Sequence, residues 1–149
     1  MRKILFRAKK KNLNEWIEGI PNKDGDYYTI NGYAIDIDTL SQLVCIGTTT
    51  EYVRRNGEYI LERKEFKLFD GDIIKVGSEY DNIYGDTTMH YSNYLCTYNE
   101  NKVAFVFYCL DDYTKFSYDD ESYLWDEFDE SEYIAVIGNK WDNPDLINW

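Results

Sequence analysis

The chain has 149 residues and a formal net charge of −12, from 16 Lys and Arg against 28 Asp and Glu. Hydrophobic residues make up 44% of it and aromatic residues 17%, which excludes a disordered chain and suffices for a buried core. The acidic balance argues against direct nucleic-acid binding and against an anionic membrane surface, because both require an excess of Lys and Arg. The length predicts a single domain over residues 1–149.

The first 62 residues predict a series of short strands. Val, Ile, Tyr, Phe and Thr dominate the apolar runs, and turn residues separate them at short intervals. The pairs Asp24-Gly25, Asn31-Gly32 and Asn56-Gly57 are typical of tight hairpin turns. The expected strands cover residues 3–7, 14–20, 26–30, 33–38, 42–47, 51–54 and 58–62.

The second half continues this pattern with two exceptions. Strands are expected on both sides of the Asp70-Gly71 turn, in a hairpin over residues 95–98 and 102–110, and over residues 133–138. Residues 78–93 are polar without periodicity and predict a long loop, and a short helix is expected near residues 121–128. Asn143 and Pro144 have the pattern of a helix start, as N-cap and first helical residue. The predicted fold is therefore mainly β, a barrel-like or sandwich-like single domain with one or two short helices.

The longest apolar stretches are too short to cross a bilayer, and the N-terminus lacks the apolar region of a signal peptide. Both observations predict a cytoplasmic protein with no membrane partner. The three cysteines, Cys45, Cys96 and Cys109, are odd in number, have no C-x-x-C spacing, and lie in or beside apolar stretches. We expect them to be small, reduced core side chains rather than disulfides or zinc ligands.

Residues 111–132 are the most unusual segment. They hold ten acidic residues and one basic residue, interleaved with aromatic side chains, and so account for −9 of the net charge of −12. The simpler interpretation is a solvated segment that keeps the protein soluble. The alternative is a protein-contact surface. Its candidate residues are Asp111, Asp112, Asp119, Asp120, Glu121, Asp126, Glu127, Asp129 and Glu130.

No catalytic pattern is present. The G-x-S-x-G, G-x-G-x-x-G and P-loop motifs are absent, and His90, the single histidine, has no sequence neighbour that would make it a metal ligand. The Asp24-Gly25-Asp26 run fails the EF-hand pattern, because Ile20 and Asn31 would then occupy its first and last ligand positions. The sequence thus predicts no catalytic residue, cofactor or metal. A hydrolase or metal enzyme built from scattered carboxylates stays open as a third possibility.

Three segments together resemble the YopX family of phage and prophage proteins. They are residues 2–8 (RKILFRA), residues 69–76 (FDGDIIKV) and residues 135–146 (AVIGNKWDNPDL). The last is similar to that family's closing Val-Ile-Gly-Asn-x-x-Glu-Asn-Pro-Glu-Leu signature. Residues 45–67 do not reproduce the family's Thr-Gly-Leu-Lys-Asp stretch, and Asp70 stands where a Glu is customary.

The resemblance implies a small, mainly β, phage-encoded protein in the bacterial cytoplasm, with no known enzyme activity or cofactor. Together with the missing catalytic pattern and the aromatic-rich composition, it favours a non-enzymatic accessory protein that acts through contacts with another protein or with itself as a homo-oligomer. An alternative is an acidic decoy for a host nucleic-acid-binding protein, because closely spaced carboxylates can imitate phosphate charge.

Overall fold

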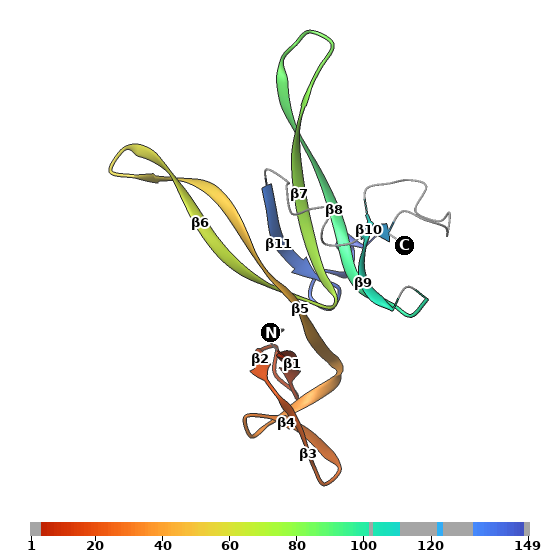
Figure 1. The fold of residues 1–149 in the computed structure, drawn as a ribbon. Coiled ribbons are helices and arrows are strands. Elements are labelled where there is room, and N and C mark those ends of the chain that lie inside the picture. Colours follow the sequence, from red (N-terminus) through yellow and green to blue (C-terminus); the bar gives the residue numbers. More distant parts are fainter. Residues whose placement is uncertain (1–3, 102, 111–121, 124–132, 148–149) are drawn as a thin grey trace.

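The computed structural model describes residues 4–101, 103–110, 122–123 and 133–147. It consists of two antiparallel sheets arranged as a sandwich-like unit and not as a closed barrel (Figure 1). The mainly β prediction is confirmed, and the helix start expected at Asn143 and Pro144 is found as a single 3-10 turn in this part of the chain. Its only helical element is the 3-10 turn Pro144–Leu146, and Ser122–Tyr123, inside the expected helix near residues 121–128, form a strand. The rest of that expected helix lies outside the described residues.

The first sheet has the strand order β2-β1-β5-β4-β3, and β6 pairs with the far half of β5. Its strands are β1 (Phe6–Lys10), β2 (Trp16–Gly19), β3 (Pro21–Asp24), β4 (Tyr27–Ile30), β5 (Tyr33–Arg55) and β6 (Glu58–Phe69). The three hairpin turns are confirmed. Asn31-Gly32 and Asn56-Gly57 have positive φ at both positions, as a type I′ turn requires, and Gly25 has φ +62.

Strand β5 joins three segments that the sequence predicts as separate strands. Its middle carries polar residues, which suggested a break. In the structure Thr39 and Ser41 are buried there, and the pairing of β1 with β5 shifts register opposite them. The Thr39 Oγ1 accepts the Lys9 N–H at 2.8 Å, so a side chain replaces the backbone partner that the shift removes.

The second sheet has the order β10-β9-β8-β7-β11. Its strands are β7 (Asp72–Asp81), β8 (Thr87–Asn99), β9 (Ala104–Cys109), β10 (Ser122–Tyr123) and β11 (Tyr133–Asn139). The loop predicted over residues 78–93 is wrong, because β7 and β8 stay paired as far as Asp81 and Thr87. Most of their outer residues are exposed, so this hairpin has no apolar face and its sequence shows no strand alternation.

The main core lies where the base of β5 and β6 packs on the second sheet. It consists of Leu68, Ile74, Val76, Cys96, Phe107 and Ile134. Cys45, Cys96 and Cys109 are free thiols, and Cys96 is fully buried in this core, where burial raises its pKa well above the ordinary value. Among the described residues no helix is long and apolar enough to cross a membrane.

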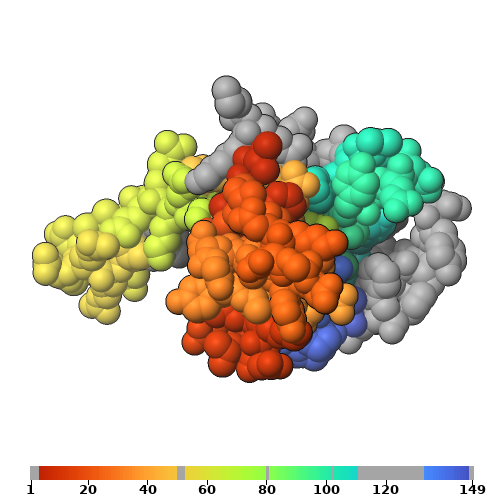
Figure 2. Space-filling model, turned by 90° about the horizontal axis from the view of Figure 1, so that it is seen from below, coloured from red at the N-terminus to blue at the C-terminus, as the bar shows by residue number. Residues whose placement is uncertain are grey.

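Two hairpins extend beyond the core. We call residues 48–65 the β5–β6 arm and residues 78–90 the β7–β8 arm. Figure 1 shows both arms projecting from the sandwich, and Figure 2, seen from below, shows the β5–β6 arm standing clear of the rest of the molecule. At about 3.3 Å per residue, the eight residues from Thr48 to Arg55 give the β5–β6 arm a length of about 26 Å. Each arm exposes side chains on both faces.

We predict that Phe107→Ala destabilises the protein by about 3–5 kcal/mol, because Phe107 is fully buried at the centre of the main core and its loss leaves a cavity. Chemical denaturation measures the free energy of unfolding. The control is Ile137→Ala on β11, where the side chain is 37% exposed, and it should cost less than about 1 kcal/mol. Equal losses for the two variants would contradict the position of the core.

Candidate functional site

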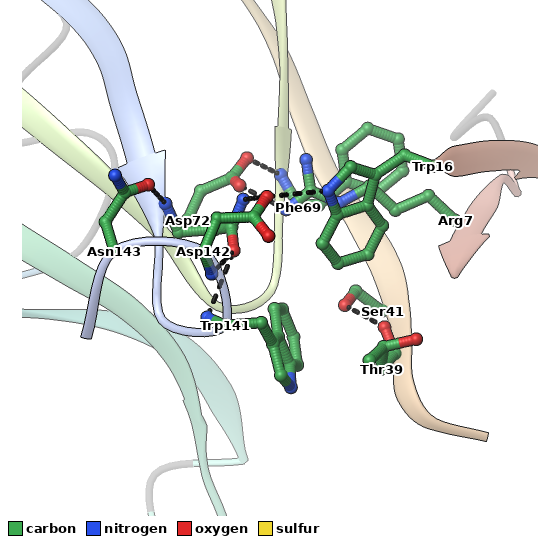
Figure 3. Close-up of polar contacts among 10 residues, drawn as sticks. Arg7, Trp16, Thr39, Ser41, Phe69, Asp72, Trp141, Asp142 and Asn143 are labelled. Atoms are coloured by element: carbon green, nitrogen blue, oxygen red, sulfur yellow. Dashed lines mark hydrogen bonds and ion pairs between the residues drawn. The ribbon is translucent and has the colours of Figure 1, made fainter. Parts of the chain in front are cut away.

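The two sheets meet at a buried ion pair between Arg7 of β1 and Asp72, the first residue of β7 (Figure 3). The Arg7 guanidinium donates to the Asp72 Oδ1, and the Phe69 N–H donates to the Oδ2 at 2.8 Å. The Asp72 side chain is only 1% exposed. Both carboxylate oxygens are therefore occupied and shielded from solvent, which leaves Asp72 no access to a substrate.

Two aromatic rings flank the guanidinium. Its carbon lies 4.6 Å from the ring centroid of Trp16 and 4.6 Å from that of Phe69. Both rings offer their π electrons to the cation at a distance where this attraction is significant, and more so because the group is largely out of water. Arg7 is thus fixed by β2, by the end of β6 and by β7 at the same time.

Burial raises the pKa of Asp72, and the adjacent Arg7 guanidinium partly offsets this effect. Burial also raises the pKa of Asp70, with Lys140 acting in the opposite direction. A raised carboxylate pKa is one mark of a catalytic acid. Here it has a structural explanation, because both residues belong to the turn that packs against Arg7.

The segment after β11 is closed by its own side chains. The Asn139 Oδ1 accepts the backbone N–H groups of Trp141 at 3.0 Å and of Asp142 at 2.9 Å. The Asn143 Oδ1 accepts the Asn139 N–H at 3.2 Å. As expected, Asn143 is the N-cap residue of the 3-10 turn and Pro144 its first residue, but the Asn143 side chain makes no cap hydrogen bond because it closes this loop instead.

Asp142 links this loop to the first sheet through contacts with Trp16 and Lys9. The Trp16 Nε1 donates to its Oδ2 at 2.8 Å, and Lys9 forms an ion pair with its Oδ1. Although partial burial opposes the charged form, hydrogen bonds from Lys9, Trp16 and Asn139 lower the pKa of Asp142 to about 2. The Trp16 and Trp141 rings meet edge to face, with centroids 5.6 Å apart.

Gly71 packs directly against the Trp141 ring. Its φ is +90, and a Cβ at this position would lie 2.5 Å from the Trp141 ring. The backbone is fixed on both sides, because the Gly71 N–H donates to the Cys96 carbonyl at 2.8 Å and the Lys140 N–H donates to the Gly71 carbonyl at 2.9 Å. Only glycine satisfies both the positive φ and the close contact.

We call this cluster the motif junction, because it contains residues of all three segments on which the family resemblance rests. Its members are Arg7, Trp16, Phe69, Gly71, Asp72, Asn139, Trp141, Asp142 and Asn143. The sequence alone placed these segments far apart and gave each a separate local role. The contacts of the motif junction hold β1 and β2 against β7 and β11.

An open hollow of about 450 Å³ lies beside the β1–β2 turn. Its lining includes Lys9, Lys10 and Lys11. Lys9 pairs with Asp142, Lys10 pairs with Glu15 at 3.1 Å, and the Lys11 ammonium lies 5.1 Å from the Tyr27 ring centroid. Because partners within the chain already engage these ammonium groups, the hollow is a basic surface and not a built anion site.

The tip of the β7–β8 arm, residues 82–86, is a tight hydrogen-bonded turn. The Asn82 Oδ1 accepts the N–H groups of Tyr84 at 2.9 Å and of Asp86 at 3.0 Å, and the Asn82 N–H donates to the Asp86 carbonyl at 2.9 Å. This turn holds Ile83 91% exposed and Tyr84 81% exposed. Sequence reasoning missed this arm tip, because it treated the region as an irregular loop.

The nine acidic residues proposed as a contact surface, Asp111, Asp112, Asp119, Asp120, Glu121, Asp126, Glu127, Asp129 and Glu130, lie outside the described residues. Within the described ranges, no three His, Cys, Asp or Glu side chains are grouped so as to hold a metal ion. His90 lies on β8 as an exposed side chain, and Asp24-Gly25-Asp26 forms the β3–β4 hairpin turn and not a calcium loop.

Comparison with known proteins found no family model, no curated protein and no solved structure that matches the chain.

We predict that Gly71→Ala costs about 2–4 kcal/mol of stability, because it combines a disfavoured φ with a clash against Trp141. The matched control is Gly25→Ala. Gly25 also has positive φ, but a Cβ there meets nothing within 4 Å, so only about 1 kcal/mol should be lost. Thermal unfolding compares the two. Equal losses of stability for the two variants would contradict a contribution of the Trp141 contact to the cost of Gly71→Ala.

We also predict a pH-dependent effect of Asp142→Asn. Because the folded-state pKa of Asp142 is about 2, below its ordinary value of 3.8, its ionised form stabilises the fold above about pH 4, and this stability is lost as the pH falls toward 2. The difference in unfolding free energy between wild type and variant should therefore shrink between about pH 5 and pH 2. Asp70 and Asp72 have raised pKa values and the opposite pH dependence, which cancels in this difference. A pH-independent difference would refute the assignment.

Proposed function

We propose that the protein acts by binding another protein, without catalysis, and that the arm tip is its principal contact. The observation that carries this proposal is the pair Ile83 and Tyr84, which are the most exposed large hydrophobic side chains among the described residues. They stand on a turn whose shape is fixed by the Asn82 side chain. Exposed apolar side chains on an ordered projecting turn are costly in a free protein and are typical of interaction sites.

The arm tip has the properties of a binding anchor. Tyrosine is among the residues that contribute most to interface energies, and a turn held by its own hydrogen bonds loses little conformational entropy on binding. Asp86 belongs to the tip, Glu79 and Asp81 precede it, and no Lys or Arg occurs between Lys75 and Lys102. The chemistry of the arm therefore fits a partner with an apolar pocket bordered by basic groups.

We further propose that the protein is a phage or prophage accessory protein of the YopX type, working in the bacterial cytoplasm. The support for this is the resemblance of the three segments, which the motif junction brings together as one structural unit. In this proposal the shared motifs maintain the body of the molecule, and the less similar arms determine what it binds.

The test is a pull-down from bacterial lysate with the wild type and with the double variant Ile83→Ser and Tyr84→Ser, quantified by mass spectrometry. Because both side chains are exposed, the variant should fold normally and should recover on the order of tenfold less of the partner. The matched control is Ile20→Ser and Tyr27→Ser, which changes side chains 52% and 58% exposed on the first sheet. A partner recovered equally by wild type and arm-tip variant would contradict the proposal.

The acidic decoy is the second candidate, and the charge of residues 111–132 favours it. A decoy should capture a nucleic-acid-binding protein at low salt only, because such an encounter is driven by screened charges. Neutralising Asp119, Asp120, Glu121, Asp126 and Glu127 should abolish that capture while the arm-tip variant retains it. If capture is instead lost in the arm-tip variant and retained after charge neutralisation, the arm tip is the binding site.

A further inference from the structure

Within the described part of the chain, β6 pairs with β5 alone, so the outer edge of β6 in the β5–β6 arm has no partner strand there. An exposed edge of this kind is a template for another strand, and natural proteins usually shorten, bend or cover it. Here the pairing with β5 runs without a register shift from Cys45 opposite Leu68 to Arg55 opposite Glu58, so the edge is long and regular.

The turn determines which residues face outward. Arg55 and Glu58 flank the two-residue type I′ turn, and such a flanking pair exchanges hydrogen bonds across the hairpin. Because hydrogen-bonded and non-hydrogen-bonded pairs alternate, the backbone groups of alternate residues starting at Glu58 point toward β5. The N–H and C=O groups of Tyr59, Leu61 and Arg63 therefore point outward, where they can pair with a new strand.

Among the described side chains of the arm, the exposed large apolar ones lie on this strand. Tyr59 is 73%, Leu61 55% and Ile60 44% exposed. Arg63 is also exposed. The strand thus combines unpaired backbone groups with apolar side chains that a second sheet edge would cover.

We propose that two copies of the chain associate by antiparallel pairing of β6 with β6 of the second copy, centred on Leu61. In this register Leu61 faces Leu61, and Tyr59 faces Arg63 of the second copy, where the cation can stack on the ring. Glu58 faces Lys64 of the second copy, so opposite charges meet at both ends. The pairs of Tyr59 with Arg63 and of Leu61 with Leu61 use the outward backbone groups. The product is one continuous sheet of β5, β6 and their symmetry mates.

Charge selects this register over its neighbours. Moving the centre by one residue toward the turn places Glu58 opposite Glu62 of the second copy. Moving the centre by one residue away from the turn places Glu62 of one copy opposite Glu62 of the other. Like charges directly opposite each other destabilise a sheet, whereas opposite charges stabilise it. The strand is therefore self-complementary about Leu61 and satisfies the two-fold symmetry of a homodimer, which favours a second copy over an unrelated strand.

Charge reversal tests the proposal in solution. Sedimentation of the full chain over a range of concentrations should show a dimer. Glu58→Lys alone, or Lys64→Glu alone, places like charges opposite each other at both ends and should weaken the dimer on the order of tenfold. The double variant Glu58→Lys with Lys64→Glu restores opposite charges and should restore the wild-type affinity. Glu65→Lys makes the same charge change opposite Gly57 and serves as the control, with no effect expected.

Amide hydrogen exchange gives a second readout, which does not depend on any variant. The N–H groups of Tyr59, Leu61 and Arg63 should become protected only at concentrations where the dimer forms. Those of Ile60 and Glu62, which face β5, should be protected at every concentration. A monomer at about 1 mM, a dimer insensitive to the single reversals, or a double variant that stays weak would each overturn the proposal. These outcomes are independent of the arm-tip variants, so self-association and partner binding can fail separately.

Discussion

The ion pair between Arg7 and Asp72 is the constraint on which the arrangement of the two sheets depends. Removing both charges from water costs several kcal/mol, and the surrounding hydrogen bonds recover only part of this cost, because the buried Arg7 Nε has no hydrogen-bond partner among the described residues. Phe69 supplies an N–H to the carboxylate, and the Phe69 and Trp16 rings enclose the guanidinium. Asp142 then draws Trp16 and Lys9 toward the end of β11. Because these contacts share members, displacement of one disturbs the others. The pair therefore specifies how β1 meets β7 more than it adds net stability.

The two arms project from the two sheets that this ion pair holds together (Figure 1). Among the described residues, the β5–β6 hairpin enters the main core at its base and not along its outer part, and the β7–β8 arm likewise lies outside that core. The exposed side chains of the two arms do not pack in the main core, and they can contact other molecules. Five of the exposed large hydrophobic side chains lie on these two arms: Tyr59, Ile60, Leu61, Ile83 and Tyr84. The two proposed contacts lie on different arms, the arm tip for a partner and the β6 edge for a second copy.

The sequence predicted the fold class and the hairpin turns, because Asn-Gly and Asp-Gly pairs and β-branched runs act through local backbone preferences. It failed where the structure depends on distant contacts. Residues 39–41 separated two expected strands, but the Thr39 hydroxyl accepts the Lys9 N–H at the bulge against β1, and the Ser41 hydroxyl donates to the Thr39 carbonyl. The β7–β8 arm has no buried face, so no periodicity marks it as paired strands. The motif junction could not be derived from spacing, since Arg7 and Asp72 are 65 residues apart.

The most direct test of this account is a double-mutant cycle with Arg7→Met, Asp72→Asn and the combined variant, with unfolding free energies measured by denaturant titration. If the pair fastens the two sheets, each single variant leaves a buried group without its partner, and the combined variant costs much less than the sum of the singles. We expect a coupling energy of at least about 2 kcal/mol and a single unfolding transition in the wild type. Additive single effects, with a coupling near zero, would contradict the central role of the pair.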